Sequence, residues 1–297
     1  MGPEPGWWVK RWVLGARPRT LVAAVVPVAV GTAAAAGAGP GIVWWRAGAA
    51  LVVAVAIQVA TNYVNDYADG QRGADRDRVG PVRLVGSGLA TVHEVKMAAL
   101  VAALVAAAAG LALAVAVGPE LVVVGAASFA AGYLYTAGPR PYGYAGWGEI
   151  FVFVFFGLVA TAGSAYVQLD QVSALALGAS VPVGLLATAL LVVNNLRDIP
   201  SDTAAGKRTL AVHLGDPSTR TLYAGLVVGA FLSLPVLALA RPTALVAFLA
   251  IPLAAAPLQA VVRSRATGAE LVPALAGTGR LQGGFGLLLT LGLALSA

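Results

Sequence analysis

Long apolar segments alternate with short polar connections along the whole chain. A helix needs about 17 to 25 predominantly apolar residues to cross a bilayer, and segments of that length recur here. We count nine of them, at residues 19–38, 44–65, 94–117, 120–137, 149–168, 173–196, 219–240, 243–262 and 280–296. Because the connections are short, this pattern predicts an all-α, polytopic membrane protein that forms a single domain over residues 1–297.

The first 18 residues differ from the segments that follow. Trp7, Trp8 and Trp12 stand beside Lys10 and Arg11, and tryptophan favours the interface between membrane and water. The first long apolar run has full helix length and lacks an evident cleavage context, unlike a secretory signal. We therefore expect residues 1–18 to form an interfacial segment.

Composition supports a membrane protein and excludes several kinds of site. Hydrophobic residues make up 59% of the chain and charged residues only 11%, whereas charged residues are about 25% of a typical soluble protein. Cysteine is absent, which excludes disulfides and thiolate metal sites. The two histidines, His93 and His213, are too few for a histidine-rich metal site and are expected to be structural.

The basic residues predict an orientation. The net charge is +6, but the positive residues are dispersed among short loops, which argues against nucleic acid as a partner. If nine helices cross and the N-terminus is cytoplasmic, all of the 19 lysines and arginines except Arg46 and Arg241 lie on the cytoplasmic side. Basic loops stay on that side. We expect a multi-pass protein of the cell inner (plasma) membrane.

A first polar motif follows the second apolar run. Asn62, Asp66 and Asp69 are spaced i, i+4 and i+7, so they share one face if the helix continues. We expect their oxygen-bearing side chains to point at one place. Carboxylates gathered at the end of an apolar segment cost several kcal/mol unless a cation lies among them.

A second motif repeats this arrangement after the sixth run, with Asn194, Asp198 and Asp202. Pro200 lies between the two acids and predicts a kink or an end of the helix there. The motifs are four helices apart, which preserves orientation. This suggests two four-helix pseudo-repeats plus one helix, arranged around a central cavity. Both motifs then face the cytoplasm across that cavity.

Paired clusters of oxygen ligands are typical of magnesium bound to a diphosphate. Mg²⁺ is usually held by one or two carboxylates plus phosphate oxygens and water, so two motifs suggest two ions. Six basic residues are placed to neutralise phosphate charge: Arg72, Arg76, Arg78, Arg83, Lys207 and Arg208. Stabilised diphosphate is a good leaving group from an allylic carbon. No Gly-x-x-x-x-Gly-Lys-Ser/Thr motif is present, which argues against a P-loop NTPase.

Four blocks of sequence resemble the UbiA superfamily of intramembrane aromatic prenyltransferases, in particular its branch that uses 1,4-dihydroxy-2-naphthoate. They are Ala16–Leu21, Asn62–Gly88, Leu134–Glu149 and Asn194–Gly215. The resemblance implies nine helices, Mg²⁺, and transfer of a polyprenyl group from polyprenyl diphosphate to 1,4-dihydroxy-2-naphthoate. Loss of CO₂ and later oxidation then give demethylmenaquinone.

The same resemblance assigns the metal and diphosphate roles to Asn62, Asp66, Asp69, Asp198 and Asp202, with Asn194 in the second substrate-binding motif. The second acid of the first motif comes after three residues, where the superfamily has four, so the metal role of Asp69 is less firmly implied than that of Asp66, and Asp75 or Asp77 is a further candidate for the metal site. Two other functions stay open. One is a different aromatic acceptor, and the other is a secondary transporter, whose acids belong near the middle of the membrane.

Side chains for the carbocation and the acceptor are harder to predict. We favour Tyr135 beside the cation and Arg140 on phosphate, and Lys207 or Arg208 could instead hold the acceptor's carboxylate. Glu149 is a candidate base for the naphthol proton, or else a helix-capping acid. Aromatic side chains could line the isoprenoid path through their π faces, namely Tyr133, Tyr135, Phe151, Phe153, Phe155 and Phe156.

Overall fold

The computed structural model describes residues 7–39, 41–72 and 82–297, and their regular secondary structure is entirely helical. The elements are α1 Trp7–Ala16, η1 Pro18–Thr20, α2 Val22–Ala35, α3 Trp44–Gln71, α4 Val92–Ala116, α5 Glu120–Leu134, η2 Tyr142–Ala145, α6 Gly148–Val152, η3 Phe153–Val159, α7 Ala160–Leu169, α8 Ala174–Ala204, α9 Leu210–Leu232, α10 Leu234–Ala238, η4 Pro242–Ala250, α11 Ile251–Leu258, η5 Gln259–Arg263, η6 Gly268–Leu271 and α12 Val272–Leu295. The all-α prediction is confirmed for these residues.

Six helical segments within the described ranges are long and apolar enough to cross a membrane. They are Trp44–Gln71, Val92–Ala116, Gly148–Leu169, Ala174–Ala204, Leu210–Ala238 and Pro242–Arg263. A seventh span is possible if Val9–Thr20 and Val22–Ala35, bent by 54°, count as one. α5 has only 15 residues. The nine-helix count and the internal repeat stay predictions.

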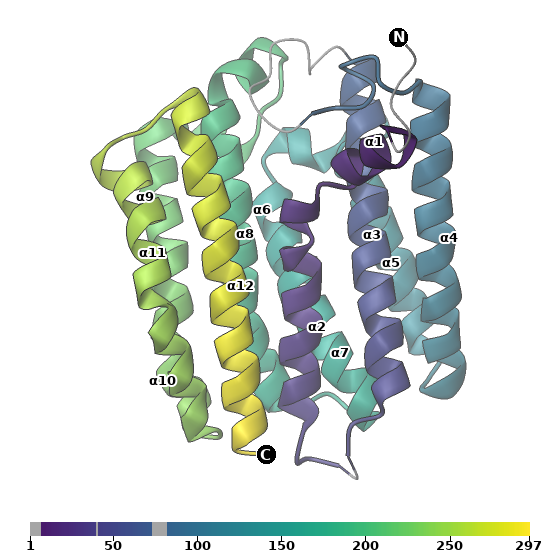
Figure 1. Ribbon diagram of the computed structural model, residues 1–297, viewed down its shortest axis with the longest axis vertical. Coiled ribbons are helices and arrows are strands. Elements are labelled where there is room, and N and C mark those ends of the chain that lie inside the picture. The colour runs from purple at the N-terminus through teal and green to yellow at the C-terminus, as the bar shows by residue number, and fades with distance from the viewer. Residues whose placement is uncertain (1–6, 40, 73–81) are drawn as a thin grey trace.

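The long helices lie side by side in one bundle, and α1 lies across the end of the bundle where α3 finishes and α4 begins (Figure 1). Side chains fasten α1 there. The Tyr63 hydroxyl of α3 donates to the carbonyl of Trp12 at 2.9 Å. Arg11 donates to the carbonyl of Leu89 at 2.8 Å and pairs with Glu94 at 3.1 Å. This position agrees with an interfacial segment, which stays a prediction; the side chains of Trp7 and Trp8 lie outside the described residues.

Small residues set how closely the helices approach. A Cβ added to Gly157 of η3 would lie 2.5 Å from the Cα of Gly184 in α8, and one added to Gly31 of α2 would lie 2.1 Å from the carbonyl oxygen of Thr161. Lipid offers no hydrophobic drive between helices, so close backbone packing of this kind replaces it. The bundle therefore depends on glycine at its crossings.

The sequence predicts a kink or an end of the helix at Pro200; α8 does not end there, and the kink stays a prediction. The helix continues to Ala204 with Pro200 inside it. Proline removes one backbone hydrogen-bond donor from the helix. Two side-chain hydroxyl groups near it donate to backbone carbonyls of the same helix. Ser201 Oγ donates to the carbonyl of Asp198 at 3.0 Å, and Thr203 Oγ1 donates to that of Ile199 at 2.7 Å. Asp202 thus remains on the helix that carries Asp198.

Arg46 and Arg241, the two basic residues predicted to lie opposite the rest, both hold backbone carbonyls. Arg46 donates to the carbonyls of Val167 at 2.9 Å and Ala116 at 3.2 Å, and pairs with Asp170 at 3.1 Å. Arg241 donates to the carbonyls of Ala36 and Ser296. Both side chains therefore satisfy carbonyl groups near helix ends, where the helix leaves acceptors unpaired.

Candidate active site

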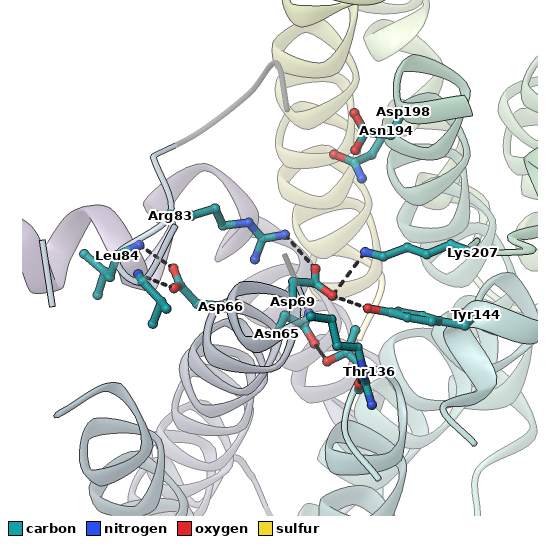
Figure 2. Close-up of polar contacts among 12 residues, drawn as sticks. Asn65, Asp66, Asp69, Arg83, Leu84, Thr136, Tyr144, Asn194, Asp198 and Lys207 are labelled. Atoms are coloured by element: carbon teal, nitrogen blue, oxygen red, sulfur yellow. Dashed lines mark hydrogen bonds and ion pairs between the residues drawn. The ribbon is translucent and has the colours of Figure 1, made fainter. Parts of the chain in front are cut away.

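Asp69 lies in the last turns of α3 and joins three parts of the chain. Its Oδ2 is 3.3 Å from Arg83 Nη2, and its Oδ1 accepts hydrogen bonds from the Tyr144 hydroxyl at 2.5 Å and from Lys207 Nζ at 3.1 Å (Figure 2). Only 3% of Asp69 is exposed. Tyr144 comes from η2, and Lys207 comes from the connection after α8. The first motif and the blocks Leu134–Glu149 and Asn194–Gly215 therefore meet at this carboxylate.

Aromatic contacts strengthen the same cluster. Lys207 Nζ lies 4.6 Å from the centre of the Tyr144 ring, and the Arg72 guanidinium lies 5.2 Å from it. Burial, and then the charge of Asp69, raise the pKa of Tyr144. Its hydroxyl therefore stays protonated at neutral pH and remains a donor to Asp69.

Asp66 is fully buried and faces a different part of the chain. Its Oδ2 accepts from the backbone N–H of Leu84 at 2.8 Å, and its Oδ1 accepts from that of Val85 at 2.9 Å. Both oxygens thus pair with the turn that follows residue 82. Asn62 faces a third region, since its Nδ2 donates to the carbonyl of Ala16 at 2.9 Å and to Thr20 Oγ1 at 3.1 Å.

The three polar residues of the first motif are all buried on α3, as their spacing predicts. They do not converge on one point, which corrects the expectation that they do. Figure 2 shows the side chains of Asp66 and Asp69 diverging from α3. Within the described ranges, no group of three or more His, Asp or Glu side chains is placed to hold one metal ion.

The second motif is organised by an arginine within it. Asp198 is 4% exposed and pairs with Arg197 through two contacts, Nε to Oδ1 at 2.7 Å and Nη2 to Oδ2 at 2.8 Å. Arg197 Nη2 also donates to Asn194 Oδ1 at 2.9 Å. Asn194 and Asp198 lie together on α8, apart from the Asp69 cluster in Figure 2.

Asp202 lies in the last turn of α8 and is partly buried. Its carbonyl accepts from the backbone N–H of Lys207 at 2.8 Å, and the N–H of Arg208 donates to the carbonyl of Tyr144 at 2.9 Å. These bonds position the connection that carries Lys207. Gly206 within it has a φ of 71°, which glycine adopts without strain.

The remaining predicted residues are distributed around this cluster. Arg72 donates to the carbonyls of Thr136 and Gly138, so it holds the turn after α5. Tyr135 is partly buried at that turn, whereas Arg140 and Arg208 are exposed. Arg76, Arg78, Asp75 and Asp77 lie outside the described residues.

Three of the aromatic side chains proposed for the isoprenoid path, Tyr135, Phe151 and Phe155, form a continuous stack through Tyr142, which is not among those proposed. The Tyr135 ring meets Tyr142 edge-on at 5.6 Å, Tyr142 stacks on Phe151 at 3.9 Å, and Phe151 lies 6.0 Å from Phe155. Tyr133, by contrast, is half exposed. Whether these rings meet an isoprenoid stays a prediction.

A cavity of about 450 Å³ lies elsewhere, between α3, α4 and α5, and it is lined mainly by apolar side chains. A smaller one of about 180 Å³ shares Tyr67, Lys96 and Tyr133 with it. Neither is lined by both acidic motifs, so the central cavity stays a prediction.

Two elements of the site were not predicted as such. Tyr144 lies in the Gly- and Pro-rich block Leu134–Glu149, but nothing in its spacing marks it as a partner of Asp69. Asn195 is the second, and its Nδ2 donates to Oε1 of Glu149 at 2.9 Å. The doubled Asn194-Asn195 was the available signal, because a second buried amide needs a partner of its own.

Comparison with known proteins identifies relatives across most of the chain. The profile of the UbiA prenyltransferase family matches residues 24–272. The chain is 52% identical over 271 residues to the 1,4-dihydroxy-2-naphthoate octaprenyltransferase of Mycobacterium tuberculosis, covering 91% of each protein. It is 38% identical over 237 residues to the protein of the same name from Escherichia coli, covering 75% of this chain and 74% of the relative.

A solved structure shares the fold. It is a UbiA homologue from Archaeoglobus fulgidus, determined bound to GPP and Mg²⁺, which superposes with a TM-score of 0.65 over 94% of this chain and 99% of its own at 16% identity. The low identity limits this likeness to the arrangement of helices.

Proposed function

The chain belongs to the UbiA prenyltransferase family, and from this premise we propose that it transfers a polyprenyl group from polyprenyl diphosphate to 1,4-dihydroxy-2-naphthoate. In the product the prenyl group replaces the carboxylate, which leaves as CO₂, and oxidation then gives demethylmenaquinone. The names of the relatives at 52% and 38% identity support this acceptor and a place in menaquinone biosynthesis.

One observation carries the proposal at the level of the site. Lys207 Nζ lies 3.1 Å from Asp69 Oδ1 although the two residues are 138 positions apart. A cation from the block Asn194–Gly215 and an acid from the first motif therefore lie together at one end of the bundle. A diphosphate needs both: a carboxylate that can hold a divalent cation, and basic groups that bind its own oxygens.

The residue types fit Mg²⁺, although no three of these acids gather at one point among the described residues. Asp66, Asp69, Asp198 and Asp202 supply hard carboxylate oxygens, and Asn62 supplies an amide; one or two carboxylates suffice when phosphate and water complete the shell. The basic side chains of Arg83 and Lys207 already lie on Asp69, so this carboxylate attracts positive charge. We propose that one ion is held at each motif. When bound, Mg²⁺ withdraws charge from the departing diphosphate.

The residues of the chain have separate tasks in this scheme. Asp69 and Asp198 accept the cations that neutralise diphosphate. Lys207 and Arg83 shift from Asp69 to the phosphate oxygens, where lysine acts as a point charge and arginine as a fork. Arg72, Arg76, Arg78, Arg140 and Arg208 add positive charge around the same oxygens. Tyr135 and the rings stacked behind it face the allylic cation and stabilise it through their π faces.

We also propose the larger arrangement. Nine helices cross the membrane as two four-helix repeats plus one helix, the acidic motifs face the cytoplasm of a plasma membrane, and a cavity between them receives both substrates. The distribution of lysine and arginine supports this orientation. The acids lie near helix ends, which disfavours the secondary transporter as an alternative.

The test is turnover by the purified protein in detergent or lipid vesicles. We expect demethylmenaquinol and diphosphate from a polyprenyl diphosphate plus 1,4-dihydroxy-2-naphthoate when Mg²⁺ is present, and neither when EDTA removes it. Asp66→Ala and Asp198→Ala should each lower turnover by at least about 100-fold, as expected for loss of charge stabilisation in the transition state.

The matched control is Asp170→Asn, which removes an acid paired with Arg46 at the other end of the bundle and should leave turnover unchanged. Normal activity of either Ala variant contradicts the metal assignment. Product formed from a different aromatic acceptor, and none from the naphthoate, contradicts the acceptor. Ion-coupled uptake without turnover supports a transporter.

A further inference from the structure

Glu149 is a buried acid that the scheme above does not use. It lies in the first turn of α6, and 6% of it is exposed. Its Oε1 accepts from Asn195 Nδ2 at 2.9 Å, but its Oε2 is buried and has no hydrogen-bond partner among the described residues. A buried carboxylate oxygen without a donor is costly. This cost needs an explanation, and a ligand that donates a hydrogen bond provides one.

Glu149 lies beside the tyrosine predicted to face the allylic cation. A Cβ added to the preceding Gly148 would lie 3.1 Å from Tyr135 Cε2 and 3.6 Å from its hydroxyl oxygen, so α6 begins directly against that ring. The carboxylate of Glu149 is therefore carried by the first turn of a helix that packs against Tyr135.

Asn195 connects Glu149 to the second motif. It follows Asn194 on α8 and is itself 6% exposed. Its amide nitrogen can only donate, so it fixes Oε1 and leaves Oε2 as the oxygen that can accept a proton. The helix that carries Asp198 thus also orients Glu149.

We propose that Glu149 binds the acceptor hydroxyl next to the carbon that is prenylated and receives its proton, with Asn195 as the positioning residue; this rests on the proposed function. As the ring carbon bonds to the allylic carbon, the O–H electron pair forms the adjacent C=O and the proton passes to Glu149 Oε2. The C–CO₂⁻ bond then breaks, and its electron pair restores the aromatic ring. The resulting oxyanion takes the proton back, and Glu149 is carboxylate again.

The mechanism separates two steps that one variant can distinguish. Glu149→Gln keeps the acceptor for Asn195 and the volume of the side chain, but it cannot take a proton. Cleavage of the C–O bond of the diphosphate does not need that proton. We therefore expect Glu149→Gln to lower prenyl transfer by at least about 100-fold, the usual contribution of a general base, while bond cleavage persists.

Bond cleavage is measured without an acceptor, from prenyl diphosphate that carries oxygen-18 in the bridging position. Reversible cleavage moves the label to non-bridging positions. Wild type and Glu149→Gln should move it at similar rates, whereas Asp198→Ala should not move it. A ring-halogenated naphthoate has a more acidic hydroxyl, so its prenylation depends less on a base. With this acceptor, the rate of prenyl transfer by Glu149→Gln should rise at least about 10-fold relative to wild type.

Controls separate a chemical role from a structural one. Glu120→Gln changes another glutamate in the first turn of a helix, hydrogen-bonded by Tyr166 at 2.5 Å and exposed, and should leave transfer unchanged. If Glu149→Gln does not fold, as judged by thermal unfolding in detergent, Asn195→Ala is used instead. It leaves the carboxylate but not its orientation, and should lower transfer by about 10-fold with label movement intact.

Three outcomes overturn the inference. They are normal transfer by Glu149→Gln, loss of label movement together with transfer, and a loss that the acidic acceptor does not reduce. If the wild-type protein moves the label but does not prenylate the naphthoate, the acceptor in the proposed function is wrong and the role of Glu149 fails with it. If it does neither, prenyl transfer itself is wrong.

Discussion

At the scale of single residues, the buried carboxylate of Asp69 is contacted by one neutral and two charged hydrogen-bond donors. The Tyr144 hydroxyl shares Oδ1 with Lys207, while Arg83 faces Oδ2. Removing one partner of a buried charged group is costly because the others stay buried. The cluster therefore contributes to the stability of the protein, and each of its members should affect folding.

Tyr144→Phe tests that conclusion. We expect the variant to lower the free energy of unfolding by about 1 to 2 kcal/mol, because a hydrogen bond to a charged group is lost in a partly buried site. The control is Tyr166→Phe, which removes a hydrogen bond to the exposed Glu120 and should have a smaller effect. Thermal unfolding in detergent micelles measures both, and equal shifts of the two melting temperatures contradict the prediction.

The sequence predicted part of this cluster. The spacing of Asn62, Asp66 and Asp69 placed them on one buried face of a helix, which α3 confirms. It could not predict their partners, because Ala16, Leu84 and Lys207 reach them through tertiary packing. The helical period shows which side chains share one face of a helix. It does not show which residues from elsewhere in the chain pack against that face.

At the scale of elements, glycine decides how η3 packs on α8. Gly157→Ala would bring a methyl group to 2.5 Å from the Cα of Gly184, a backbone atom that cannot turn aside. We expect a loss of about 1 to 3 kcal/mol of stability, the usual cost of overpacking. The matched variant is Gly163→Ala in α7, where nothing lies within 4 Å. It should be neutral or slightly stabilising, since alanine favours a helix.

The same denaturation assay compares the two glycine variants. A Gly157→Ala protein as stable as Gly163→Ala would mean that the helices separate without cost.

Helix positions were better predicted than helix ends. The apolar run 44–65 became α3, Trp44–Gln71, and the run 173–196 became α8, Ala174–Ala204. In both cases the helix continues through the polar motif, where hydropathy falls although the backbone stays helical. The π-helical segment Phe153–Val159 was not predicted, because a wider turn leaves no mark on apolar composition.

At the scale of the whole molecule, the chain offers a direct test of its orientation. It contains no cysteine, so single cysteines can be introduced and labelled one at a time. Val172 lies just before the 31-residue helix α8 and Thr203 lies in its last turn, and both are exposed. At 1.5 Å per residue the helix is about 46 Å long. That length exceeds a bilayer core.

We expect a membrane-impermeant thiol reagent to label Val172→Cys in intact cells and Thr203→Cys only after the membrane is opened. The reason is that both acidic motifs are proposed to face the cytoplasm together with most of the basic residues. Labelling of both positions from the same side contradicts a crossing by α8. The reverse pattern contradicts the orientation alone.

The contact between Asp69 and Lys207 also sets an order of events during synthesis. The carboxylate leaves the ribosome long before the ammonium group that will neutralise it, since 138 positions separate them. Until then a growing chain holds an acid that lacks one of its partners. Assembly of the Asp69 cluster therefore waits for the residues that follow α8, so a truncated chain that stops before this helix leaves the buried acid with one charged donor fewer.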